Sequence, residues 1–188
     1  MADLFDTPPD PGSVAPRDPA REAQRPLADR LRPRHLSEVI GQEAVLSPEG
    51  PLGAMLKAHS LSSLILWGPP GVGKTTIARL LAAETDLAFV QISAIFTGVP
   101  DLKKVFEAAK VRRQTGQGTL LFVDEIHRFN KAQQDSFLPH MEDGTILLVG
   151  ATTENPSFEL NAAVLSRAQV IILQRLPLAD LERMAQRA

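Results

Sequence analysis

A glycine-rich stretch, GPPGVGKTT at residues 68–76, has the composition and spacing of a phosphate-binding loop. It fits the pattern Gly-x-x-x-x-Gly-Lys-Ser/Thr. Glycines let the backbone turn its N–H groups toward phosphate oxygens, the lysine reaches the terminal phosphates, and the threonine hydroxyl coordinates Mg²⁺. An ordinary turn between a strand and a helix would not call for the lysine–threonine pair. The candidate nucleotide-binding residues are Gly68, Pro69, Pro70, Gly71, Val72, Gly73, Lys74, Thr75 and Thr76, and Thr75 is also a candidate Mg²⁺ ligand.

Two adjacent acids, Asp124 and Glu125, follow the apolar run Leu120–Val123. An apolar strand that ends in acids places both carboxylates at the carboxyl edge of a sheet, where nucleotide-binding folds hold their ligands. Asp124 is the candidate to hold Mg²⁺, and Glu125 the candidate to orient and deprotonate the attacking water. Taken alone, two acids would simply end a strand at the surface. The phosphate loop one strand–helix–strand unit upstream favours the catalytic interpretation.

A third polar strand end lies in ILLVGATTEN, residues 146–155. A hydroxyl or amide there reaches between a terminal phosphate and a water molecule. We favour Thr153 for this sensing role and rank Thr152 and Asn155 behind it.

Short apolar runs alternate with segments of helical periodicity from Pro26 onward, which predicts a doubly wound α/β domain with a parallel sheet. The expected strands cover residues 64–67, 87–92, 119–123, 146–149 and 170–173. The helices include residues 102–109, residues 131–142 with a bend or end at Pro139, and residues 158–165. Residues 1–24 are expected to be a disordered, proline-rich leader, residues 25–175 the α/β core, and residues 176–188 the start of another helical unit.

Composition narrows the classes of protein further. The 188 residues include no cysteine, which excludes disulfides and thiolate metal sites and fits a cytoplasmic protein. The formal net charge of −2 predicts that any contact with DNA is local or shared between subunits. No apolar stretch approaches the length of a membrane span.

Together, the phosphate loop, the acidic pair and the polar strand end resemble the AAA+ ATPases. The blocks EIHRFNKAQQD and GATTENPSFELN are similar to the bacterial replication-associated recombination protein A family, related to the Werner-helicase-interacting ATPase. The resemblance covers residues from Pro26 onward. It implies a P-loop core with a five-stranded sheet of order 5-1-4-3-2, and an ATP- and Mg²⁺-dependent ATPase that acts on DNA at stalled replication forks.

The same resemblance implies further roles and partners. Arg167 would be an arginine finger that reaches the γ-phosphate of a neighbouring subunit, and Val39 and Ile40 would lie near the adenine base. Family members form oligomers, expected to be tetramers, and continue into a helical lid with a second sensor, so the sequence would end as that lid begins. Without the family, Arg167 would be read as a surface arginine before a strand.

Further partners and activities stay open on the sequence alone. Leu4 and Phe5 resemble the end of peptides that bind the bacterial sliding clamp, and a single-strand-binding protein is a further candidate partner at the nucleoid. The alternatives to a fork-rescue ATPase are a clamp-loader-like or branch-migration ATPase and a slowly hydrolysing, nucleotide-switched scaffold. The loop 95–99 either faces a central pore, as equivalent loops do in related motors, or is an ordinary strand-to-helix connection in which Phe96 is buried.

Overall fold

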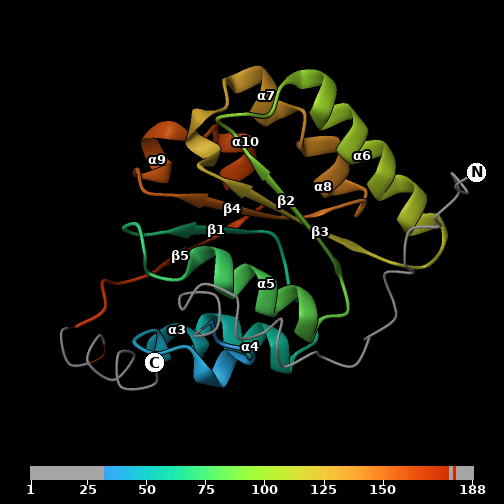
Figure 1. Ribbon diagram of the computed structural model, residues 1–188. Helices are drawn as coiled ribbons and strands as arrows, with labels where there is room; N and C mark the ends of the chain where they lie inside the picture. Colours follow the sequence, from blue (N-terminus) through green and yellow to red (C-terminus); the bar gives the residue numbers. More distant parts are fainter. Residues whose placement is uncertain (1–31, 178–179, 181–188) are drawn as a thin grey trace, which may run out of the picture.

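The computed structural model describes residues 32–177 and 180 of the chain. Five parallel strands form one sheet in the order β2-β3-β4-β1-β5, which confirms the expected order 5-1-4-3-2. Figure 1 shows the sheet between two layers of helices, with α3, α4 and α5 on one face and α6 to α10 on the other. The strands are β1 (Leu64–Trp67), β2 (Ala88–Ser93), β3 (Thr119–Asp124), β4 (Leu147–Thr152) and β5 (Gln169–Ile172). The longer helices are α4 (Pro51–Lys57), α5 (Lys74–Glu84) and α6 (Val99–Gln114).

Shorter helical segments complete the described part of the chain. They are η1 (Leu36–Glu38), α3 (Glu43–Leu46), η2 (Ile126–Arg128), α7 (Lys131–Asp135), α8 (Leu138–Glu142), α9 (Pro156–Glu159) and α10 (Ala162–Leu165). Over residues 32–177 and 180, no helix has the length and apolar character needed to cross a bilayer.

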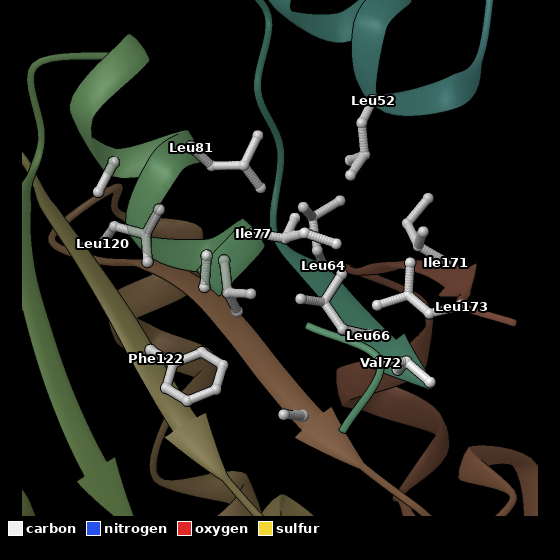
Figure 2. Close-up of a cluster of buried hydrophobic side chains, with 14 residues drawn as sticks. Leu52, Leu64, Leu66, Val72, Ile77, Leu81, Leu120, Phe122, Ile171 and Leu173 are labelled. Atoms are coloured by element: carbon white, nitrogen blue, oxygen red, sulfur yellow. The ribbon is translucent and has the colours of Figure 1, made fainter. Parts of the chain in front are cut away.

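The central strands are buried on both faces, as expected for a parallel sheet covered by helices. Leu64 and Leu66 of β1 pack with Ile77 of α5 in one cluster, which Figure 2 shows in close-up. Ile65, between them in sequence, packs in a second cluster with Phe106 of α6. Successive side chains of β1 therefore point to opposite faces of the sheet, and each face carries its own hydrophobic core.

The segment 131–142 is interrupted, as the sequence predicts, but the break lies at Ser136 and Phe137 rather than at Pro139. α7 ends at Asp135, and α8 begins at Leu138 with the proline at its second residue, where its missing N–H costs little.

The prediction of one helix over residues 158–165 is wrong. The chain forms α9 and α10 instead, with Leu160 extended between them. The buried Gln134 explains the break, because its amide donates to Glu159 O at 3.1 Å and accepts from Asn161 N at 2.8 Å. Asn161 then caps α10 by accepting from Val164 N at 2.8 Å.

Candidate nucleotide site

The phosphate loop lies between the end of β1 at Trp67 and the start of α5 at Lys74. Gly71 and Gly73 have φ values of +81° and +95°, in the region that glycine adopts without strain. A Cβ atom at either residue would meet nothing within 4 Å, so backbone conformation rather than space requires glycine there. At Gly68 the reason differs, because a Cβ atom would lie only 2.4 Å from Leu173 O. That glycine lets the loop start tightly against the chain that follows β5.

The Lys74 side chain folds back into the loop. Its Nζ donates to Gly68 O at 2.7 Å and to Pro69 O at 2.8 Å, and the residue is 8% exposed. Burial lowers the pKa of this ammonium group, while the negative charges of Glu125 and Asp124 act in the opposite direction. The site therefore holds a partly desolvated cation that can contact phosphate oxygens, beside two carboxylates that can hold a metal ion.

The two acids lie where the sequence predicts. Asp124 is the last residue of β3 and pairs in register with Ser93 of β2. Glu125 has φ +53°, unusual for a residue with a side chain, and the chain turns there into η2. This turn at the carboxyl edge places both carboxylates on the same cavity as Lys74.

That cavity has a volume of about 810 Å³. Most of the predicted nucleotide-binding residues line it, from three separate segments of the chain: Val39, Ile40, Pro70, Gly71, Val72, Gly73, Lys74, Thr75, Thr76, Asp124 and Glu125. Gly68 and Pro69 are not among the lining residues and contribute carbonyl oxygens to Lys74 instead. The hydroxyl of Thr75 and the carboxylate of Asp124 are oxygen donors of the kind that Mg²⁺ prefers.

Several lining residues escape sequence reasoning. They are Arg79, Gln91 and Leu176. Arg79 follows Thr75 by four residues on α5. Residues with this spacing lie on the same face of a helix, so the sequence could have indicated that Arg79 lies near the site. Its guanidinium group donates to Gln91 Oε1 at 2.9 Å and lies 4.9 Å from the centre of the Phe89 ring. Leu176 lines the site from the segment after β5, and no local sequence pattern predicts this position.

The two threonines at the end of β4 differ in environment. Thr152 is fully buried, and its hydroxyl oxygen lies 2.9 Å from His127 Nδ1 and accepts from Glu154 N at 3.0 Å. Thr153 is half-buried and is not among the residues that line the cavity. The sensing role of Thr153 stays a prediction.

Arg167 lies at the other edge of the sheet. It precedes β5, whose first residue pairs with Leu64 at the start of β1, whereas the phosphate loop follows the end of β1. Its guanidinium group contacts Glu142 Oε1 through Nε at 2.7 Å and Nη2 at 2.6 Å. Nη1 donates to Ala163 O and Ser166 Oγ, both at 3.0 Å. Arg167 is exposed and does not line the nucleotide cavity of its own chain.

A P-loop site at the carboxyl edge of a sheet of this order defines the class of protein. Residues 64–176 match the ATPase family associated with various cellular activities (AAA), and the chain belongs to that family. Nucleotide binding and ATP hydrolysis are the properties of this class, and the expected α/β ATPase fold is confirmed.

Within the family, the chain is similar to particular relatives. It is 51% identical over 164 residues to replication-associated recombination protein A of Escherichia coli (strain K12), which covers 87% of this chain and 37% of the relative. It is 46% identical over 162 residues to the ATPase WRNIP1 of Dictyostelium discoideum, covering 86% of this chain and 18% of that protein. The expected resemblance is confirmed, and the chain spans little more than a third of the first relative.

A solved structure supports the same class. The RuvB Holliday junction branch migration motor of Thermotoga maritima superimposes with a TM-score of 0.69 and is 33% identical, covering 84% of this chain and 53% of that one.

Proposed function

We propose that this chain is the ATP-hydrolysing core of a DNA-dependent ATPase that acts at stalled or damaged replication forks in recombination and repair. The observation that carries the proposal is the joint lining of one cavity by Lys74, Thr75, Asp124 and Glu125. The identity of half the aligned residues with replication-associated recombination protein A supports the replication context.

The residues of the cavity divide the work of phosphoryl transfer. Backbone N–H groups of residues 71–75 and the Lys74 ammonium group hold the phosphates, and Val39 and Ile40 cover the base. Thr75 and Asp124 would hold Mg²⁺, which neutralises charge on the phosphates when bound. Glu125 orients the attacking water and accepts its proton, and Thr153 senses the terminal phosphate.

Arg167 completes the site of a neighbouring subunit. Because it lies at the edge opposite its own phosphate loop, it acts in trans or not at all on ATP. A guanidinium group suits this role because its planar fork meets phosphate oxygens with two hydrogen bonds and never loses its charge. The proposal therefore includes a homo-oligomer, which we expect to be a tetramer, as the hydrolysing form.

The partners and location follow from the proposed reaction. DNA forks, gaps or ends are the expected substrates, and the sliding clamp or a single-strand-binding protein are candidate partners in the cytoplasm at the nucleoid. Leu4 and Phe5, the leader 1–24 and most of the proposed lid 176–188 lie outside the described residues.

A branch-migration ATPase is the rival function with a specific observation in its favour. The similarity to RuvB would fit it, because that relative is a Holliday junction branch migration motor. A clamp-loader-like ATPase and a slowly hydrolysing, nucleotide-switched scaffold are two further candidates. The higher identity to replication-associated recombination protein A, 51% against 33%, favours fork rescue.

The rate of ATP hydrolysis tests these proposals directly. It should rise when forked, gapped or blunt-ended DNA is added, and a closed circular duplex of equal length, which has no ends, is the control. Stimulation only by four-way junctions would favour branch migration, and an equally slow rate with every DNA would favour the scaffold.

A further inference from the structure

His127 is a buried polar residue of the site to which the proposed mechanism gives no role. It lies in η2, directly after the turn at Glu125, and its side chain is only 7% exposed. Its Nδ1 atom is 2.9 Å from Thr152 Oγ1 and 3.4 Å from Glu125 Oε2. One ring nitrogen therefore stands between the candidate catalytic base and the end of β4.

Packing of the neighbouring Ile126 fixes this position. Ile126 is fully buried and lies against Gly150 of β4, where a Cβ atom would come within 2.8 Å of Ile126 Cδ1 and 2.9 Å of Ile65 Cδ1. Only glycine at residue 150 lets η2 approach β4 this closely. The approach brings the next residue, His127, beside Thr152.

The hydrogen bonds at Thr152 determine which ring nitrogen carries the proton. The hydroxyl donates to Glu154 O at 3.2 Å and accepts from Glu154 N at 3.0 Å. With that hydrogen directed to Glu154 O, His127 donates to the hydroxyl oxygen through Nδ1–H. A carboxylate only accepts, so the same Nδ1–H is also the group that Glu125 requires. We assign this tautomer from the network.

We propose that His127 is a positioning residue for Glu125, which it ties to the end of β4 through the shared Nδ1–H group. The proposal rests on the proposed role of Glu125 in hydrolysis. The contact engages Oε2 and leaves Oε1 to accept the proton of the attacking water. The contact also holds the Glu125 carboxylate against the electrostatic attraction of the Lys74 ammonium group. Such contacts are often long without substrate and shorten in the reacting complex.

Three variants at one residue test the geometry. His127→Asn places an amide donor where Nδ1 stands, His127→Gln places it near the Nε2 position, and His127→Ala removes it. Turnover is measured with ATP in single-turnover assays, affinity with a fluorescent nucleotide, and folding by thermal unfolding. We expect His127→Ala and His127→Gln to lower the hydrolysis rate about tenfold with unchanged affinity, and His127→Asn to recover most of it. Equal rates for the asparagine and glutamine variants, when both are folded, would overturn the proposal.

A double variant separates this proposal from the one on which it rests. If His127 acts through Glu125, adding His127→Ala to Glu125→Gln should lower the rate no further. A further tenfold loss in that background would overturn the positioning role, because His127 would then act independently. A normal rate for Glu125→Gln alone would instead overturn the role of Glu125 itself.

Discussion

The two edges of the sheet each carry a cation that is important for the proposed reaction, Lys74 at the carboxyl edge and Arg167 at the amino edge. The two cations differ in burial and in their partners. At the carboxyl edge, Lys74 is 8% exposed and bound to backbone carbonyls of its own loop. At the amino edge, the Arg167 side chain is 40% exposed and bound mainly to one carboxylate, Glu142. The first group is built into the fold of a single chain, whereas the second stands at the surface, where a neighbouring subunit can meet it.

The difference suggests a division of labour between subunits. β1 alone spans about 10 Å between the two edges, and Arg167 lies before its start. Under the proposed mechanism, one chain therefore contributes residues to two hydrolytic sites and completes neither of them alone. Substitutions at the two edges should accordingly separate nucleotide binding from turnover.

Removal of the finger should have the largest effect. We expect Arg167→Ala to lower the rate of ATP hydrolysis by roughly 10³–10⁵-fold in the oligomer, since a finger of this kind stabilises charge only in the transition state. Its ATP affinity, from fluorescent-nucleotide titration, should stay within about twofold. Arg113→Ala is the matched control, because Arg113 is also exposed and also pairs with a carboxylate, that of Asp143 at 3.8 Å. A similar loss in the control would remove the distinction between the two arginines.

The base at the carboxyl edge should come next. Glu125→Gln should keep ATP affinity and lower turnover by roughly 10²–10⁴-fold, because an amide does not accept the proton of the attacking water. Glu107→Gln, an exposed acid paired with Lys110 at 2.8 Å, should leave turnover unchanged. Loss of affinity in Glu125→Gln would contradict its assignment as the base.

Lys74→Ala should act on binding instead. Loss of a charge-assisted contact to the terminal phosphates costs roughly 2–5 kcal/mol, so we expect affinity for ATP to fall by about 30-fold or more. Equilibrium titration with and without Mg²⁺ measures the change, and Lys104→Ala, with a side chain 80% exposed, is the control. Affinity as high as that of the control would contradict a phosphate-binding role for Lys74.

The smallest effect should come from the partner of the finger. Glu142→Gln breaks an exposed ion pair, so the free energy of unfolding in urea should fall by less than about 1 kcal/mol. By contrast, Gly150→Ala should destabilise the fold by more, because the new Cβ atom would collide with Ile126 and Ile65. If Glu142→Gln lowered the free energy of unfolding more than Gly150→Ala does, the ion pair at the amino edge would be a major contributor to stability, contrary to this account.

The sequence predicts the parts of the site that are contiguous in the chain. The phosphate loop and the acidic strand end are read from short motifs, and each expected strand differs from the observed one by at most three residues at its ends. The strand order, however, came from the family resemblance, since no local pattern encodes which strands pair.

What escaped prediction depends on contacts between distant residues. The break between α9 and α10 is made by Gln134, more than twenty residues upstream, and Leu176 reaches the cavity only through the fold. Phe96 is 87% exposed, in contrast to the buried ring expected of an ordinary connection. No hydrophobic pattern distinguishes that exposed aromatic residue from a core one.

The central claim is that one chain supplies the base and its neighbour supplies the finger. The most direct test mixes Glu125→Gln and Arg167→Ala under conditions in which a tagged copy of one captures the other. Some sites in such mixed assemblies pair an intact Glu125 with an intact Arg167 of the adjacent chain. We expect hydrolysis to recover to a measurable share of the wild-type rate, with a maximum near equal proportions. A mixture as inactive as either variant alone, despite capture of mixed assemblies, would contradict the account.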